Sequence, residues 1–327
     1  MNDKSSLVRI GSLVLLGFLM VSCNSESEGI QPAEEQLNLM AISGMDRIND
    51  GSYLSVYDLK SFEEGNRVGI IEVSEDIGIN VYPVKVTHWQ HEDGAGSDLE
   101  SVCGLHNRDN EFLIAESGKW DGKFGRMFHL KLTGDSTSYE AQVLGVLDLP
   151  EFDAKGPQDN AGDEIEGLAC ISTQTDNVMV LLGERGGSSA YPNGLIRWAE
   201  ADLSDYSLNW SEKGRKGVEV NAPGNWVDDK KNRDISALYI DGGNSLWATA
   251  SEELGDNGPF NSLIYKVGTV QVDDQIPIRL VKNFEVYKTL NGFKAEAITG
   301  GTELIPGSVF AIGTEDELLG GSWRVMN

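Results

Sequence analysis

Glu164-Ile165-Glu166-Gly167-Leu168, followed by Val180-Leu181-Leu182-Gly183-Glu184, is the stretch that decides the fold of this chain. The phrase combines an acidic residue, a Glu two positions later and an aliphatic run that ends at a second Glu. It recurs at intervals of roughly 60 residues, at 98–102 with 112–116, at 234–238 with 246–252 and at 294–298 with 309–315. Repetition at a regular period indicates an array of similar structural units.

Short β-type runs dominate each of these units. About four runs rich in β-branched and aromatic residues occur per unit, separated by clusters of Gly, Asn, Asp and Ser. Four-stranded sheets repeated around an axis are the blades of a β-propeller. No helical periodicity of a dozen residues occurs after the N-terminal region, which argues against an α/β fold. The sequence therefore predicts an all-β propeller.

Five blades fit the spacing of the units, and six is the alternative because residues 213–233 could contain further strands. The last unit lacks an outer strand. Residues 36–39 could supply that strand from the N-terminal side and so close the ring, which would remove an exposed sheet edge.

The N-terminal region reads as a targeting segment. Lys4 and Arg9 precede an apolar run at 10–21, and Met20-Val21-Ser22-Cys23 resembles a bacterial lipobox. Residues 1–22 are therefore expected to be a lipoprotein signal peptide, and Cys23 is expected to be lipidated and to anchor the protein to a membrane. The alternative is an ordinary signal peptide with an incidental Cys.

Polar and acidic residues follow Cys23, so residues 23–36 are predicted to be a flexible tether and residues 37–327 a single propeller domain. An acidic tract after the lipidated Cys resembles export signals of surface lipoproteins in Bacteroidetes-like bacteria. The expected location is the outer membrane, with the protein facing either the periplasm or the cell surface.

The net charge limits the classes of partner that the protein can bind. The formal net charge is −26, which repels nucleic acid, and no basic stripe with interleaved aromatic residues offsets it. We therefore expect no nucleic-acid partner. An acidic surface concentrates cations, although it can also serve solubility alone.

The repeated Glu residues are the best candidates for a site. In a propeller blade the inner strand begins and the next strand ends at the same face, so both sets of Glu are expected at one mouth of the central channel. Two carboxylates about 5 Å apart repel by roughly 3 kcal/mol at an effective dielectric of 20. The predicted metal ligands are Glu100, Glu116, Glu166, Glu184, Glu252, Glu296 and Glu315.

Such a cluster of carboxylates needs something that compensates its negative charge. A hard cation, Ca²⁺ first, would be held by these oxygen ligands. The first alternative is internal ion pairing, because Lys119, Arg185, Arg233 and Lys294 are near the acidic positions in sequence. The second is that the carboxylates are separately solvated. The third copy of the phrase has Ser236 where Glu is expected, which leaves the ring of carboxylates incomplete.

Two of the four His of the chain, His88 and His91, lie in the loop before the second unit. A His-x-x-His pair can bind a metal or transfer protons, so His91 is a candidate catalytic residue together with Glu166, Glu184 and Glu296. The alternative is a polar surface loop.

Cys103 and Cys170 occupy corresponding strands of successive units. Cys103 follows Glu100 by three positions and Cys170 follows Glu166 by four, so in extended strands they face opposite sides relative to these Glu. An oxidising compartment allows a disulfide, but this parity predicts two separate buried thiols.

The repeats resemble a known group of propellers. Glu164-Ile165-Glu166-Gly167-Leu168-Ala169 with Val180-Leu181-Leu182-Gly183-Glu184-Arg185 is similar to the repeat of phytase-like and SdiA-regulated propeller proteins. The closing segment 294–324 resembles their last blade. The resemblance covers residues 100–327 and implies a propeller, with calcium-dependent hydrolysis of phosphate esters as one activity found in the group.

Two functions follow from these observations. The first is a cation-assisted hydrolase of a phosphate ester or related ester, acting on a small anionic ligand. The alternative is a non-catalytic binding or scaffold propeller that holds a glycan, a peptide or a partner protein on one face of the disc. The sequence contains no Gly-x-Ser-x-Gly elbow and no His-Glu-x-x-His motif, so serine hydrolysis has no support.

Overall fold

The computed structural model describes residues 41–59, 65–74, 78–89, 94–118, 125–135, 138–149, 163–173, 177–189, 191–227, 231–271 and 275–327. The expected signal peptide, Cys23, the tether and the closing strand at 36–39 lie outside the described residues, as do His91 and Lys119. Within the described ranges, no helix combines the length and apolarity that crossing a membrane requires.

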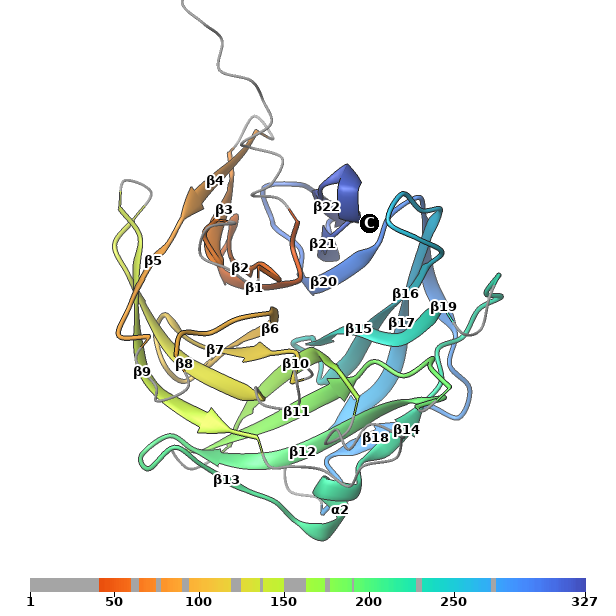
Figure 1. Ribbon diagram of the computed structural model, residues 1–327, viewed down its shortest axis with the longest axis horizontal. Coiled ribbons are helices and arrows are strands. Elements are labelled where there is room, and N and C mark those ends of the chain that lie inside the picture. The colour runs from red at the N-terminus through yellow and green to blue at the C-terminus, as the bar shows by residue number, and fades with distance from the viewer. Residues whose placement is uncertain are drawn as a thin grey trace, which may run out of the picture. The chain divides into compact units, whose positions relative to one another are not determined.

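Five sheets follow one another along the chain and stand around a central axis (Figure 1), which confirms the five-bladed propeller. Blade 1 contains β1 (Gly44–Asn49), β2 (Ser52–Val56), β3 (Val68–Val73) and β4 (Ile79–Pro83). Blade 2 contains β6 (Leu99–Gly104), β7 (Glu111–Glu116), β8 (Arg126–Thr133) and β9 (Glu140–Asp148). A short strand, β5 (Lys85–Thr87), pairs in parallel with β9.

The next two blades each carry a divided outer strand. Blade 3 contains β10 (Ile165–Ser172), β11 (Val178–Glu184) and β12 (Gly194–Asp202), with β13 (Ser207–Asn209) and β14 (Val218–Val220) both paired to β12. Blade 4 contains β15 (Asn232–Ile240), β16 (Ser245–Glu253) and β17 (Phe260–Val270), with β18 (Ile278–Leu280) and β19 (Val286–Asn291) both paired to β17.

Blade 5 has three strands in the described part of the chain. They are β20 (Ala295–Gly300), β21 (Phe310–Thr314) and β22 (Trp323–Met326), and a 3₁₀ turn, η2 (Glu317–Leu319), lies between the last two. Within each blade neighbouring strands of the main path are antiparallel.

The segment 213–233 does not form a sixth blade. After β13 the chain makes one short helix, α2 (Glu212–Lys216), whose first turn is capped by Ser211 accepting a hydrogen bond from the Gly214 N–H at 2.9 Å. The chain then returns as β14 to the edge of β12. This segment therefore supplies the second half of a divided blade edge and not a blade of its own.

Hydrophobic cores lie between neighbouring blades, which is why the strands are apolar on both faces. Five buried clusters occur, and each contains residues of two adjacent blades. Trp198 of blade 3, for example, belongs to the same cluster as Tyr265 of blade 4. Fully burying a large apolar side chain stabilises a fold by about 1.5–3 kcal/mol, so these clusters hold the ring together.

The first and last blades meet directly and close the ring. Asp46 Oδ1 in β1 accepts a hydrogen bond from the Thr299 hydroxyl in β20 at 2.7 Å, and Asp46 Oδ2 accepts one from the Gly104 N–H in β6 at 2.6 Å. Asp46 therefore joins blades 5, 1 and 2. The Ile42 N–H donates to the Thr314 carbonyl at 3.0 Å beside this contact.

A disulfide joins Cys103 in β6 to Cys170 in β10, with the two Cα atoms 5.6 Å apart, so the prediction of two separate thiols is wrong. The different spacing of the two Cys from Glu100 and Glu166 does place them on opposite faces of their strands, but this arrangement favours the disulfide. At the junction of two successive blades, one blade contributes one face of its sheet and the next blade contributes the opposite face of its own sheet. Cysteines on opposite faces of successive blades are therefore the ones that can meet.

Candidate functional site

The first Glu of each repeat is the extra residue of a β-bulge. In blade 2, Leu99 pairs with Glu116 and Ser101 pairs with Ala115, so Glu100 has no partner of its own. Glu166 in β10 and Glu296 in β20 are skipped in the same way. A bulge changes the direction of a side chain from the one that the regular alternation along a β-strand would give it. All three carboxylates are buried. Arg233 contacts both Glu166 and Glu296, and the charge of Glu166 acts on Glu100.

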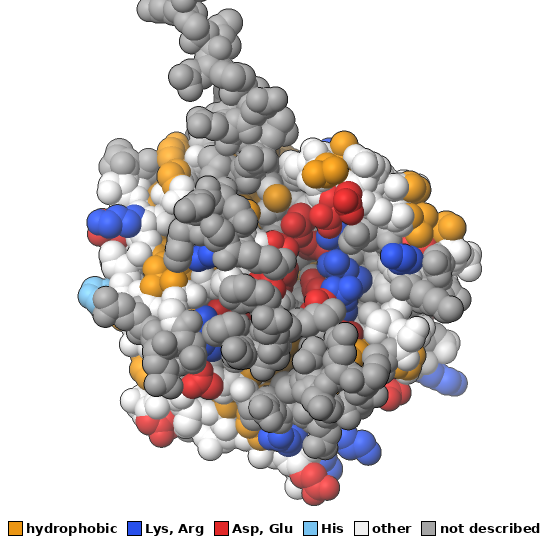
Figure 2. Space-filling view, viewed as in Figure 1, with side chains coloured by type: hydrophobic (Ala, Val, Ile, Leu, Met, Phe, Trp, Pro, Cys, Tyr) orange, Lys and Arg blue, Asp and Glu red, His pale blue; other side chains and the backbone are white. Residues whose placement is uncertain are grey.

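The residue directly after the second strand is the other position that the repeat brings to this mouth. The N–H groups of Ser117, Arg185 and Glu315 donate to the carbonyls of corresponding residues at the start of each blade, at 2.9–3.0 Å. These three residues are therefore structural equivalents. Figure 2 shows acidic and basic side chains gathered near the centre of this face.

Glu116 and Glu184 precede those positions by one residue, so they face the other side of the strand. Glu116 accepts two hydrogen bonds from Arg126, at 2.6 and 2.9 Å, and one from the Ser97 N–H at 3.0 Å. Glu184 is paired with Arg197 of its own blade. The structure thus places these two predicted site residues in ion pairs inside the blades, not beside Glu100 or Glu166.

Glu252 also has a partner within its own blade. It is buried, and its carboxylate accepts a hydrogen bond from the Asn261 side chain at 3.3 Å. Ser236, which replaces the first Glu in this copy, lies 2.5 Å from Ser251, oxygen to oxygen. Blade 4 therefore contributes a pair of hydroxyls where blades 2, 3 and 5 contribute carboxylates.

Half of the mouth is made of carboxylates held by cationic side chains, and we call it the paired half: Glu166, Glu296, Glu315, Arg185, Arg233 and Lys294. Arg233 Nη1 lies 2.6 Å from Glu296 and 3.4 Å from Glu166. Arg185 Nη1 lies 3.5 Å from the other oxygen of Glu166. Lys294 Nζ lies 3.1 Å from Glu296.

The carboxyl groups of the paired half differ widely in acidity. Burial raises the pKa of Glu296, but Lys294 and Arg233 outweigh it and bring this pKa down to about 2. Burial raises the pKa of Glu166 to about 7 against the opposing effect of Arg233. Burial, followed by the charge of Glu296 and a hydrogen bond to it, raises the pKa of Glu315 well above its usual range.

Glu315 is therefore the less acidic of the two carboxyl groups that meet here. Glu296 Oε2 is buried and meets no N–H or hydroxyl donor in the described part of the chain. A hydrogen bond between two carboxyl groups needs a shared proton, and the opposite pKa shifts favour Glu315 over Glu296 as the group that carries it.

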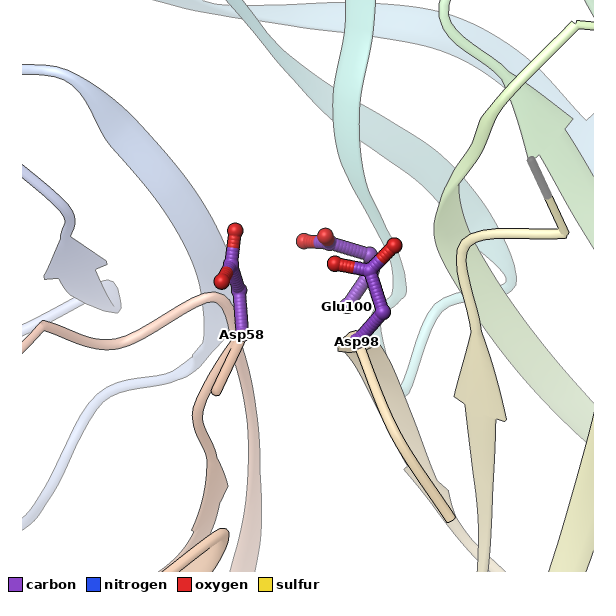
Figure 3. A group of neighbouring side chains, drawn as sticks. All are labelled: Asp58, Asp98 and Glu100. Carbon is purple, nitrogen blue, oxygen red and sulfur yellow. The ribbon is translucent and has the colours of Figure 1, made fainter. Parts of the chain in front are cut away.

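The other half of the mouth, which we call the acidic half, consists of Asp58, Asp98 and Glu100. One carboxylate oxygen from each lies within 4.8 Å of the others. Figure 3 shows Asp58, which follows β2 of blade 1, facing Asp98 and Glu100 at the start of β6. Asp98 has a left-handed backbone, with φ 56°, and accepts a hydrogen bond from the Ser117 hydroxyl at 2.5 Å.

Glu100 is the most strongly affected member of the acidic half. Burial is the main cause that raises its pKa well above the usual range, and the charges of Glu166, Asp58, Glu315 and Asp98 raise it further. Crowding of this kind is relieved by protons or by a cation.

The geometry of the acidic half fits a hard divalent ion. Calcium binds oxygen ligands at about 2.3–2.6 Å, so two ligands on opposite sides of one ion are separated by roughly twice that distance. The carboxylate oxygens of Asp58, Asp98 and Glu100 are no farther apart than this span. Carboxylate oxygens from two separate blades could thus share one ion.

Asp58 was missed in the sequence because blade 1 has no copy of the repeated phrase. Blade 1 has Ser43 at the position where blades 2, 3 and 5 have Glu, and the Ser43 hydroxyl accepts a hydrogen bond from the Asp58 N–H at 3.0 Å. The signal was the order of residues at the end of β2, Val56-Tyr57-Asp58, which corresponds to Ala115-Glu116-Ser117 of blade 2.

Neither a protein-family model nor a curated protein matches this chain. Solved structures with a similar fold include an endo-1,4-beta-xylanase from Bacteroides thetaiotaomicron, at 9% identity and a TM-score of 0.49, covering 89% of this chain and 91% of that one. A putative glycoside hydrolase from Parabacteroides distasonis is 12% identical, with a TM-score of 0.46 and coverage of 85% and 84%.

A GH43_12 protein from a capybara gut metagenome is 14% identical, with a TM-score of 0.44. The match covers 83% of this chain but 46% of that one, so this chain spans about half its length. At such identities and superpositions no activity is transferred from these proteins to this chain.

Proposed function

We propose that this protein is a lipid-anchored, extracytoplasmic β-propeller that binds a divalent cation, Ca²⁺ first, at its acidic mouth and hydrolyses a phosphate ester there. The observation that carries the proposal is the convergence of Asp58, Asp98 and Glu100 from two blades at a distance suited to one ion. The resemblance of the repeats to phytase-like propellers supports the same activity.

The charge of the mouth supports a cation in the acidic half. In the paired half, Arg185, Arg233 and Lys294 contact the carboxylates directly. In the acidic half, the main influences on Glu100 are burial and further carboxylates. A divalent cation supplies the countercharge that the acidic half needs at neutral pH.

Residues of the paired half fit the chemistry of hydrolysis. A bound cation polarises a phosphoryl oxygen and lowers the pKa of water. Glu166, with a pKa of about 7, is suited to exchange a proton near neutral pH. Arg185 and Arg233 are partly exposed, with 27% and 16% of their side chains accessible, and guanidinium groups suit the anionic part of such a substrate.

Titration with Ca²⁺ followed by calorimetry tests the cation site. Wild-type protein should bind one ion in this site, and Asp98→Asn or Glu100→Gln should abolish binding. Glu140→Gln is the matched control, because it removes a carboxylate from the exposed edge of the same blade. Absence of Ca²⁺ binding by the wild type would refute the proposal.

Assays on phosphomonoesters and phosphodiesters test the reaction. Glu166→Gln should lower kcat by about 10²-fold or more if Glu166 transfers a proton, while Ca²⁺ binding persists. Calcium binding without hydrolysis of any ester would leave the binding or scaffold propeller, holding a glycan, a peptide or a protein, as the function. The location follows from Cys23 and is tested by metabolic labelling with a fatty acid, which Cys23→Ala should prevent.

A further inference from the structure

The turn between β21 and β22 presents two neighbouring leucines to solvent on the mouth face of blade 5. Leu318 and Leu319 are 74% and 62% exposed, and of the large apolar residues in the described ranges only Val227 is comparably exposed. Figure 2 shows hydrophobic side chains beside acidic ones over this blade, with basic side chains closer to the centre. A single exposed apolar residue needs no explanation, but adjacent ones bordered by polar groups are a candidate contact for a ligand.

Hydrogen bonds fix the conformation of this turn. The Asp316 carboxylate accepts hydrogen bonds from the Lys294 N–H at 2.7 Å and from the Thr314 hydroxyl at 2.8 Å. The Asp316 N–H donates to the Gly320 carbonyl at 2.6 Å and so closes the turn. Glu317 has a left-handed backbone, with φ 47°, which a residue other than Gly keeps only where its surroundings enforce it. The two leucines are therefore held in a defined place.

Lys294 connects the turn to the paired half of the mouth. Its Nζ bonds to the carboxylate of Glu317, the residue directly before Leu318, and lies 3.1 Å from Glu296 Oε1. Arg233 Nη1 lies 2.6 Å from that same oxygen of Glu296. A path of contacts thus leads from a partly exposed guanidinium group, through an ammonium group, to the exposed leucines.

The two ends of this path suit different parts of one ligand. Arg185 and Arg233 are partly accessible, and guanidinium groups match the oxygens of a phosphoryl group. Leu318 and Leu319 have no hydrogen-bonding group in their side chains, so they favour an alkyl or aryl group, whose burial against them is favourable for each CH₂ removed from water.

We propose that Leu318 and Leu319 form an apolar subsite of the mouth, so that the phosphate ester bound here is amphiphilic, with an alkyl or aryl group attached close to its phosphate. The anionic end of this assignment rests on the proposed function. The apolar end rests on the exposure and the fixed position of the two leucines. The same chemistry occurs in the headgroup region of a lipid and in a soluble alkyl phosphate.

Binding of n-alkylphosphonates, from methyl to octyl, tests the subsite without requiring any reaction, because their C–P bond is not an ester bond. Calorimetric titrations, with Ca²⁺ and with EDTA, compare the wild type, Leu318→Ser/Leu319→Ser and Val309→Ser. Val309 is the matched control, because it is 48% exposed and directly precedes β21, whereas the two leucines follow the other end of that strand.

We expect the wild type to bind octylphosphonate at least tenfold more tightly than methylphosphonate, because each buried CH₂ adds to the affinity. The double variant should lose most of this gain while its affinity for methylphosphonate stays within twofold of the wild type. Val309→Ser should behave like the wild type. Equal affinity along the series in the wild type, or an unchanged gain in the double variant, would overturn the proposal.

Failure of this inference can be told from failure of the proposed function. If the gain with chain length depends on the two leucines but the wild type binds no Ca²⁺ and hydrolyses no ester, the subsite stands and the proposed function fails. If the wild type hydrolyses methyl and octyl phosphate with equal kcat/KM and the phosphonates show no gain, the proposed function stands and the subsite fails.

Competition against octylphosphonate separates the two sources of such a ligand. The competitors are dihexanoyl phosphatidic acid as a monomer and long-chain phosphatidic acid in phosphatidylcholine vesicles. Competition by both would support a lipid in a membrane as the ligand, and competition by the monomer alone would support a soluble amphiphile. Competition by neither would overturn the assignment of an amphiphilic phosphate ester.

Discussion

The two halves of the mouth derive from the same repeated phrase but solve the problem of crowded carboxylates differently. In the paired half, Glu166 and Glu296 are held by Arg233, which contacts both. In the acidic half, Glu100 faces Asp58 and Asp98, which raise its pKa further above its usual range. In the paired half, Arg and Lys side chains of the protein neutralise the carboxylates, whereas the acidic half favours binding of a proton or a cation.

Part of the difference arises from Arg233 and Lys294, which contact the carboxylates of the paired half, and part from one structural position, the residue after the second strand of each blade. Blade 3 has Arg185 there, blade 2 has Ser117, and the corresponding position of blade 1 is Asp58. A single substitution at this position therefore changes the local charge by one or two units. The lesson is that the repeat supplies the carboxylates, and the charges of the residues around them decide how they are compensated.

Removing the central cation of the paired half should have the largest effect. Arg233→Met leaves Glu166 and Glu296 buried without their shared guanidinium, and breaking a buried ion pair in this way costs about 3 kcal/mol or more. Urea unfolding at pH 7 measures the change, and Arg233→Lys, which keeps the charge, should lose much less. A loss below about 1 kcal/mol would show that the two halves are not compensated differently.

Calcium should stabilise the protein through the acidic half alone. A ligand at 100 times its Kd stabilises the folded state by about 2.7 kcal/mol. Asp98→Asn should abolish this gain, whereas Glu315→Gln in the paired half should keep most of it. The measurement is the shift of the urea midpoint on adding Ca²⁺, and an equal loss in both variants would contradict the division of the mouth.

The stability of the calcium-free protein should fall as pH rises. The pKa of Glu166 is raised from 4.5 to about 7 on folding, so its contribution is fully present below pH 4.5 and is lost as pH rises through 7. We expect a loss on the order of 2–3 kcal/mol between pH 5 and pH 8. Glu166→Gln should flatten this dependence in urea unfolding with EDTA, and an unchanged slope would count against the raised pKa.

Relieving the repulsion in the acidic half should have the smallest effect, with a sign opposite to that of Arg233→Met. Glu100→Gln removes a buried charge surrounded by carboxylates, so the calcium-free protein should gain about 1 kcal/mol at pH 7. Calorimetric melting in EDTA measures the gain, with Glu140→Gln as the control. Destabilisation by Glu100→Gln would mean that the ionised carboxylate is internally satisfied.

The fold could be predicted from the sequence because the period and the turn residues are local signals. The repeat placed the inner strands of blades 2 to 5 and correctly brought Glu100, Glu166, Glu296 and Glu315 together. Residue spacing could not show which face of β7 or β11 a Glu occupies, so Glu116 and Glu184 were expected at the mouth. The sequence does not reveal Asp58 because blade 1 lacks the phrase, and it does not reveal the disulfide because the pairing depends on how successive blades pack.

The contact between Asp46 and Thr299 has a consequence for the order of folding. These residues are separated by 253 positions in the chain, so closing the ring requires one of the longest loops that the chain can form. The entropy cost of closing a loop grows with its length, and long-range contacts slow folding. The contact between blades 1 and 5 is therefore expected to form late, so the folding chain passes through an open crescent in which its first and last blades are not yet joined.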